Sequence, residues 1–228
     1  MSDLIIPERL ARLDSLVPLR GGHSKNAEIN ACTMELVAWV AGESWSDAPQ
    51  CACPVITGFV VSWNDSLPND EARNRLLKPL IPAIVGTRST PDVEEKRSYM
   101  ALDWLIRVHT PKWLDMVPAL HEHAKALREL DAIVDMAGAT AAGVKVRLAQ
   151  QDAAAAWAAA GDAAGDAAGD AAGDAAGDAA WDAAWDAARA AAWAAAGDAA
   201  RDALKPTTEW LQGSAVDLVK RMCAVQAS

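Results

Sequence analysis

Charged and amide side chains interrupt several apolar stretches of the chain, and these residues could support chemistry. Glu35 lies inside the apolar run MELVAWVAG, and Glu43 follows that run directly. The others end or interrupt further apolar stretches, and they are Asp47, Asn64, Asp65, Arg88, Asp103 and Arg107. Burial of a charge is costly unless the charge is paired and hydrogen-bonded. These residues therefore predict either a structural ion-pair network or the polar groups of a binding site.

The network interpretation, which we favour, pairs Glu35 or Glu43 with Arg88 or Arg107, and Asp103 with Arg107 four residues later. The alternative is a small-molecule pocket whose carboxylates orient a cationic or hydroxylated ligand. Four indoles would wall it, those of Trp45, Trp63, Trp104 and Trp113. The predicted binding residues are Glu35, Glu43, Trp45, Asp47, Asn64, Asp65, Arg88, Asp103, Trp104 and Arg107. Such a pocket would suit a ligand-binding domain or an enzyme, and the sequence assigns no catalytic residue.

The cysteines and histidines carry no metal or nucleophile signature. Cys51 and Cys53 are not matched by a second pair, and His121 and His123 would point to different sides of a helix. A cysteine–histidine nucleophile would lack any local signature. We therefore expect buried thiols, no metal and no cofactor.

The elements that must position these residues are predicted to be helices. After an extended start, residues 26–41 form a mostly apolar helix ended by Gly42. Pro54 suits the first turn of a second helix, and Asn69 can cap a third. No stretch shows convincing strand alternation, so we expect an all-α protein.

Further helix signals follow along the chain. Residues 90–92, Thr-Pro-Asp, should begin a helix that runs to about His109, and residues 110–112, Thr-Pro-Lys, should begin a short one. Residues 138–143 are a plausible joint before an alanine-rich helix. Pro206 should stop that helix, after which a last amphipathic helix begins.

Residues 151–204 repeat the tetrad x-Asp-Ala-Ala, with thirty Ala, ten Asp and six Gly. A helix turns by about 100° per residue, so each tetrad advances its own column by about 40°. A straight helix would therefore have no constant apolar face, and a lasting contact would need a right-handed wrap. Asp pairs four residues apart repel each other, so cations or a closely packed helix should stabilise this segment.

Small and indole side chains on the repeat predict an interface, because small residues let backbones approach and tryptophans anchor the contact. The predicted interface residues are Trp157, Gly161, Gly165, Gly169, Gly173, Gly177, Trp181, Trp185 and Trp193. The Asp column itself has three interpretations: a solvating face, a ladder that meets Arg or Lys of a partner, or a mimic of DNA phosphates.

Charge and composition bound the function. The chain has 228 residues and a formal charge of −10, and within residues 151–204 only Arg189 and Arg201 oppose the ten Asp. Such a repeat should not bind nucleic acid directly, since phosphate neutralisation requires Lys and Arg. Residues 1–20 hold no signal-peptide core, and Asp in every tetrad excludes a membrane span. Four cysteines then suggest reduced thiols in the cytoplasm.

A set of motifs is spread over nearly the whole chain: MELVAWVAGE with SDAPQC, WND, VGTR, ALDWLIRVHTPKWL, the x-Asp-Ala-Ala repeat, and LKPT with LQGSAVDLVKRM. As a set they resemble a group of actinobacterial and actinobacteriophage proteins with an alanine-rich repeat. The resemblance implies a lineage and no mechanism. The five uninterrupted Gly-Asp-Ala-Ala units look like a local expansion of the repeat, because the proteins that the chain resembles mix Trp, Arg and Gly more evenly at the first position of the tetrad.

Together these observations predict an N-terminal helical domain at residues 1–138, an alanine-rich tetrad-repeat helix at 139–205, and a C-terminal amphipathic helix at 206–228. The leading function is a non-enzymatic binding or assembly protein that forms a homo-oligomer or docks a protein partner through the repeat. The alternatives are a small-molecule-binding domain or enzyme with the tryptophan-lined pocket, and an acidic DNA-mimic inhibitor.

Overall fold

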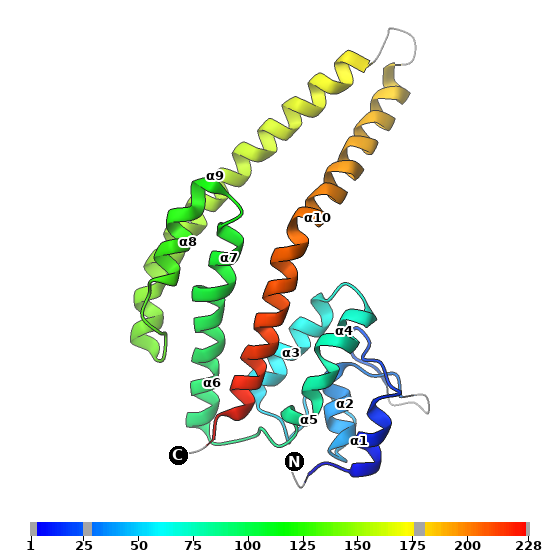
Figure 1. Ribbon diagram of the computed structural model, residues 1–228, viewed down its shortest axis with the longest axis vertical. Coiled ribbons are helices and arrows are strands. Elements are labelled where there is room, and N and C mark those ends of the chain that lie inside the picture. Colours follow the sequence, from blue (N-terminus) through cyan, green and yellow to red (C-terminus); the bar gives the residue numbers. More distant parts are fainter. Residues whose placement is uncertain (1–3, 25–28, 176–180, 227–228) are drawn as a thin grey trace. The chain divides into compact units, whose positions relative to one another are not determined.

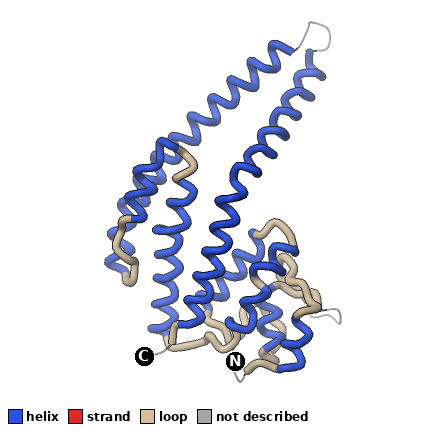
Figure 2. Tube along the Cα trace, viewed as in Figure 1, coloured by secondary structure: helices blue, strands red, loops and turns tan. Residues whose placement is uncertain are grey.

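The protein is all-α, as the sequence predicts. A computed structural model describes residues 4–24, 29–175 and 181–226, and the side chains of residues 157–201 lie outside that description. Helices and the loops between them make up all of the described chain, without a strand (Figure 1, Figure 2). The chain divides into two compact units. The first comprises the residues up to Trp104, Ile133–Met136 and the residues from Gln212 onward, and the second comprises Leu105–Ala132 and Ala137–Leu211.

Short helices build the first unit, and each begins at a local signal. The elements are α1 (Pro7–Leu13), α2 (Thr33–Val40), α3 (Pro54–Ser66), α4 (Asp70–Leu76), η1 (Lys78–Leu80), α5 (Ile81–Ile84), α6 (Pro91–Trp104) and the last turns of α10 (Trp181–Ala224). The predicted start signals at Pro54 and Pro91 are confirmed as first helical residues. Asn69 caps α4 by accepting a hydrogen bond from the Ala72 N–H.

Helix α2 lies at the centre of the first unit. All of its residues except Trp39 are buried, and it packs against α1, α3 and α5. The chain leaves α2 through Gly42, whose φ of +76° suits glycine, and a Cβ there would lie only 2.7 Å from the Ile6 Cδ1. The core also includes Leu218, Val219 and Met222 of α10, all fully buried, although they come from the other end of the chain.

Two helix boundaries in the first unit differ from the prediction. The N-terminal segment contains α1 rather than an extended start, and Pro7 occupies its first turn. The helix predicted at residues 26–41 begins at Thr33, because Cys32 and Glu35 form a capping box that fixes the start there. The first residues of that prediction, 26–28, lie outside the described chain.

The second unit joins a short helical hairpin to the long alanine-rich helices. Its elements are η2 (Leu105–His109), α7 (Thr110–Leu114), η3 (Pro118–Leu120), α8 (His121–Arg128), α9 (Met136–Ala175) and the first part of α10. Helices α7 and α8 pack against each other and against η2. The side chains of Leu114, Leu120, Ala124, Leu127, Ala142 and Ala149 are buried.

Two predicted interruptions of the alanine-rich segment are wrong. Residues 138–143 are not a joint, because α9 runs through both glycines, and Pro206 lies inside α10 rather than at its end. An internal proline removes one hydrogen bond and costs about 3 kcal/mol. Burial of Leu211, Ala215 and Leu218 after Pro206 offsets that cost, since each large apolar side chain contributes about 1.5–3 kcal/mol.

The repeat backbone is helical from Gln151 to Ala175 and from Trp181 onward. The predicted interface residue Gly177 lies in the stretch 176–180, which is outside the described residues. The other predicted interface residues fall within 157–201, whose side chains are likewise not described, so that interface stays a prediction. None of the described helices is long and apolar enough to cross a membrane.

Candidate functional site

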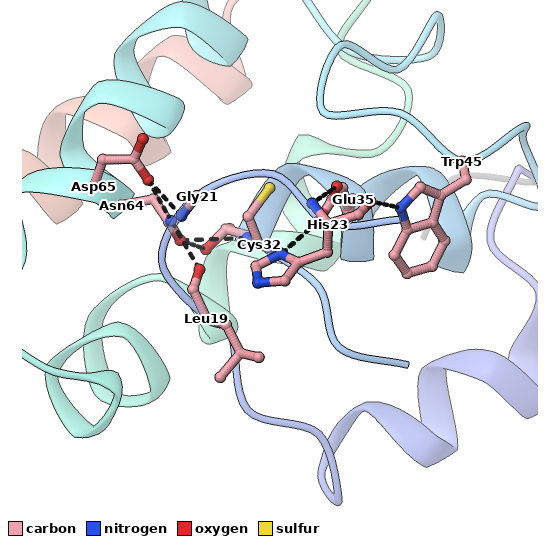
Figure 3. Close-up of polar contacts among 9 residues, drawn as sticks. Leu19, Gly21, His23, Cys32, Glu35, Trp45, Asn64 and Asp65 are labelled. Atoms are coloured by element: carbon pink, nitrogen blue, oxygen red, sulfur yellow. Dashed lines mark hydrogen bonds and ion pairs between the residues drawn. The ribbon is translucent and has the colours of Figure 1, made fainter. Parts of the chain in front are cut away.

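Glu35 is the most completely bonded buried carboxylate of the first unit (Figure 3). Its Oε1 accepts the N–H of His23 at 2.6 Å, and its Oε2 accepts the N–H of Cys32 at 2.7 Å. The His23 Nδ1 lies 3.2 Å from the same Oε2. The Glu35 side chain is only 4% exposed, so these three contacts replace the water that a carboxylate would otherwise bind.

The position of Glu35 follows from the start of α2. Glu35 is the third residue of that helix, and its carboxylate reaches back to the backbone N–H of Cys32, the N-cap residue. This is one half of a capping box, which satisfies N–H groups that a helix start leaves unbonded. The other carboxylate oxygen, Oε1, accepts the N–H of His23 in the preceding loop.

His23 is held from two sides. Its backbone N–H and its ring contact Glu35, while its carbonyl oxygen accepts a hydrogen bond from the Trp45 Nε1 at 2.7 Å. A Cβ added to Gly22 would lie 3.9 Å from both the Asp47 Oδ2 and the Glu35 Oε1, so both carboxylates border this glycine. The loop before α2 is therefore fixed by groups from α2 and from the loop that follows it.

Asn64 and Asp65 fix the same loop from the end of α3. The Asn64 Oδ1 accepts from the Thr33 Oγ1 at 2.8 Å, and its Nδ2 donates to the Leu19 carbonyl at 2.9 Å and to the Asp65 Oδ1 at 3.0 Å. The Asp65 Oδ1 also accepts the Gly21 N–H at 2.9 Å. The hydrogen bond from Asn64, followed by that from Gly21, lowers the pKa of Asp65 below its usual value. Asn64 thus bonds both the loop and α2, and Asp65 bonds the loop.

Arg73 of α4 closes the network beneath α3. Its side chain is 3% exposed, and its Nε and Nη2 donate to the carbonyl oxygens of Asn64 and Leu67 at 2.8 Å each. Its Nη1 pairs with Asp70 at 2.6 Å. Because Arg73 bonds the carbonyls at the C-terminal end of α3, it fixes the turn that presents Asn64 and Asp65.

Burial opposes the ionisation of three of the cysteine thiols. Burial raises the pKa of Cys32 to about 12, and it raises the pKa values of Cys51 and Cys223 to about 11 each. Thiolates, not thiols, are the nucleophiles and metal ligands, so these three side chains are inert near neutral pH. The described part of the chain holds no group of three or more residues that could bind a metal ion.

The structure gathers five of the ten predicted binding residues around the loop before α2. Glu35, Trp45, Asn64 and Asp65 bond to it directly, and Asp47 borders it. The other predicted residues make separate contacts. Glu43 accepts the Gln50 N–H, Asp103 accepts the Ile133 N–H, and the Trp104 Nε1 donates to the Ser214 Oγ. Arg107 belongs to the second unit.

Two of the residues in the predicted ion pairs have other partners, and the predicted pair of Asp103 with Arg107 stays a prediction. The partner of Glu35 is His23, and Arg88 lies 3.4 Å from Glu94 instead. The fold brings His23 of the loop at residues 19–23 to Glu35, whereas Arg88 lies close in sequence to the acidic first turn of α6. The favoured idea of a structural network therefore agrees with the bonding of Glu35, although its cation was misassigned.

Two of the four predicted pocket indoles share a packing partner, and the other two have contacts elsewhere. Trp63 and Trp104 each approach Phe59 edge-on, with ring centroids 6.0 and 5.8 Å apart. Trp45 donates to the His23 carbonyl, and Trp113 lies in the second unit beside His109. These contacts account for the indoles by packing and hydrogen bonding.

Sequence reasoning missed His23, Thr33 and Arg73 as members of the network. Two weak signals preceded them. Gly21 and Gly22 permit a close backbone approach just before His23, and Asp70 lies three residues before Arg73 on one helix face. Neither signal identifies the distant partner, because the loop contacts depend on the tertiary fold.

The network positions a loop, and the oxygens of Glu35 are already occupied by donors. In chemical terms it favours stability and a fixed loop over proton transfer, which requires a carboxylate able to reach a substrate. No protein-family model, curated protein or solved structure matches the chain. Function must therefore be inferred from the chain's own residues.

Proposed function

We propose that the protein is a non-enzymatic binding and assembly protein, which self-associates or docks a protein partner through the helices that carry its tetrad repeat. The observation that supports this most directly is an exposed apolar pair at the base of the repeat. Val144 is 53% exposed and Leu148 is 51% exposed, and both belong to α9.

Val144 and Leu148 share one face of α9, because residues four apart are neighbours on a helix. Helix α9 continues without interruption from this pair into the repeat. A partner helix that covers Val144 and Leu148 could therefore continue along the Ala and Gly positions that follow. Removal of this apolar surface from water would favour association by about 25 cal/mol per Å².

Exposed apolar side chains also lie at the C-terminal end of the repeat and just after it. Leu204 is 37% exposed and Trp210 is 50% exposed, both on α10. Single exposed apolar residues are ordinary, but exposed tryptophans are enriched at interfaces. The described residues on both flanks of the repeat thus offer apolar contact area.

The composition of the repeat gives a second reason for a partner. Asp at every fourth residue places like charges four apart, which destabilises an isolated helix by roughly 0.2–0.5 kcal/mol per pair. A partner that supplies Arg or Lys would remove this repulsion. The same partner could approach closely, because Ala and Gly leave the backbone uncovered.

The bonding of Glu35 makes the competing enzyme or ligand-pocket hypothesis weaker. A carboxylate that already accepts hydrogen bonds at both oxygens would have to break them to bind a ligand. We further propose that the protein acts in the cytoplasm, where its four free cysteines would stay reduced.

Light scattering on the full chain over a wide concentration range tests the proposal. The wild-type protein should increase in mass with concentration. A double substitution, Val144→Gln with Leu148→Gln, should weaken association by at least tenfold. Gln150→Ala is the control, because it changes an exposed residue about 120° from Val144 and about 160° from Leu148 on the same helix and should have little effect.

Two results would contradict the proposal. One is a strict monomer at all concentrations that also captures no protein partner. The other is association that both the double variant and the control leave unchanged, because the exposed pair on α9 would then play no part.

A further inference from the structure

The second unit contains a basic cleft that none of the contacts above explains. It has a volume of about 370 Å³ and is lined by Arg107, Val108, Lys112, Asp115, Arg128 and Trp210. Three of the lining side chains are cationic and one is anionic. This is an unusual concentration of positive charge in a chain whose formal charge is −10.

A π-helical turn places Arg107 and Val108 at the cleft. Residues Leu105–His109 form this turn, directly before Pro111. Pro111 has no N–H, and in a regular α-helix its ring would collide with the carbonyl of Arg107, four residues earlier. The wider turn avoids that collision, and the Thr110 Oγ1 donates to the Leu105 carbonyl at 2.8 Å. Single π turns often occur at functional sites.

Two of the lining cations have contacts inside the cleft. Asp115 pairs with Arg128, whose Nη2 also lies 3.4 Å from the Pro111 carbonyl oxygen. The Lys112 Nζ lies 5.1 Å from the centre of the Trp210 ring, close enough for a cation–π contact. Its lining thus holds three cationic side chains, one carboxylate and a half-exposed indole.

The chain's own repeat has the complementary chemistry. Residues 161–175 carry an Asp in every tetrad, contain no cation, and otherwise consist of Ala and Gly. Their backbone is helical within α9, so successive Asp residues are separated by about 6 Å along the axis. A carboxylate of such a helix could meet Lys112, and the adjoining Ala surface could lie on the Trp210 ring.

We propose that this cleft binds the Asp-bearing segment 161–175 of a second copy of the chain. The inference rests on the proposed function, since it names one of the surfaces through which copies would associate. It assigns Lys112 as the cation that pairs with the Asp column, and Trp210 as the apolar platform. Association should therefore weaken as salt rises, because the contact is electrostatic.

The test uses the full-length protein and a capped peptide of residues 161–175 as the probe. The Trp210 indole N–H resonance is followed by ¹H–¹⁵N NMR, with Trp210→Phe to assign it. The peptide should shift this resonance in a saturable manner, and Lys112→Glu should weaken binding at least tenfold. Lys125→Glu is the matched control, because Lys125 is an exposed cation of α8 outside the cleft lining. A second control peptide carries Asn in place of every Asp and should not bind.

Several outcomes would overturn the inference. They are equal binding of the Asp and Asn peptides, equal effects of Lys112→Glu and Lys125→Glu, and succinate binding as tightly as the peptide. The last result would make the cleft a site for small anions. The proposed function fails separately: copies that still associate in Lys112→Glu would refute the cleft and keep self-association. A protein that stays monomeric but binds the peptide through Lys112 would refute self-association and support the carboxylate chemistry of the cleft.

Discussion

At Glu35, one carboxylate both caps α2 and holds the loop that precedes it. Its Oε1 and Oε2 accept the N–H groups of His23 and Cys32, and the side chain is almost fully buried. Replacement of Glu35 by Gln removes the charge and turns one acceptor into a donor facing N–H groups. Hydrogen bonds to a charged group contribute about 1.5–3 kcal/mol each, so we expect Glu35→Gln to lower the free energy of unfolding by at least that amount.

Urea unfolding followed by circular dichroism measures this change. Glu43→Gln serves as the matched control, because Glu43 also accepts a backbone N–H, that of Gln50, but in an exposed position. It should cost less than about 1 kcal/mol. Equal stability of wild type and Glu35→Gln would show that the buried network contributes nothing to the fold.

Cys32 should impose a pH dependence on stability. Its pKa rises from 9.0, the value for a free thiol, to about 12 through burial. The folded protein therefore keeps the thiol proton when the unfolded chain has lost it. The contribution of Cys32 to the free energy of unfolding is fully present below pH 9. It is lost at about 1.4 kcal/mol per pH unit as the pH rises towards 12. In Cys32→Ala the fall in unfolding free energy between pH 9.5 and 11 should be shallower by about that slope, as denaturant titrations at each pH would measure. An unchanged slope would mean that the thiol ionises in the folded state.

At the scale of elements, the sequence identified three helix starts correctly and predicted two interruptions that the helices do not have. Pro54, Asn69 and Pro91 act through their own backbone geometry or through a bond to a residue three positions away, so their effect is local. Pro206 and the glycines at 138 and 143 are also local signals, but they are penalties of only a few kcal/mol. Burial along α9 and α10 exceeds such penalties, and burial depends on partners that the local sequence does not reveal.

The candidate site shows the same limit. Glu35, Trp45, Asn64 and Asp65 were predictable as polar or indole groups beside apolar runs. Their common target was not, because the segment at residues 19–23 has no regular structure that a sequence pattern could register. The partner predicted for Glu35 was wrong for the same reason: His23 reaches it through the tertiary fold.

Gly42 provides an element-scale prediction, because it allows the turn that ends α2. Its φ is +76°, and an added Cβ would lie 2.7 Å from the Ile6 Cδ1. We expect Gly42→Ala to destabilise the protein by about 1–3 kcal/mol through the left-handed backbone and the contact with Ile6. Gly58→Ala should do the opposite and stabilise by about 0.5–1 kcal/mol, since Gly58 is helical and nothing lies within 4 Å of its added Cβ. Thermal unfolding should show a lower melting temperature for Gly42→Ala and a higher one for Gly58→Ala than for the wild type. A shift of both melting temperatures in the same direction would refute this account.

At the scale of the whole molecule, the first unit is assembled from both ends of the chain. Leu218, Val219 and Met222 of α10 are fully buried in it, and Arg97 of α6 donates to the carbonyls of Met222 and Val225 at 2.9 and 3.0 Å. The third donor of Arg97, its Nη1, bonds the Thr87 carbonyl. The guanidinium thus joins α6, the loop before it and the C-terminal end of α10.

A chain that ends at residue 138 should therefore not fold stably alone, although the sequence predicts residues 1–138 as the N-terminal domain. Loss of three buried side chains at about 1.5–3 kcal/mol each removes roughly 5–9 kcal/mol, which is comparable to the total stability of a typical domain. Arg97 would also lose two of its acceptors while its own burial remained costly.

We expect fragment 1–138 to show a broad, non-cooperative thermal transition, and the addition of a peptide of residues 208–228 to restore a cooperative one. The same peptide with Leu218→Asp should fail to do so, because the burial of Leu218 would then require burial of a charge. A fragment 1–138 that unfolds cooperatively without the peptide would show that the helices up to α6 form a sufficient core by themselves.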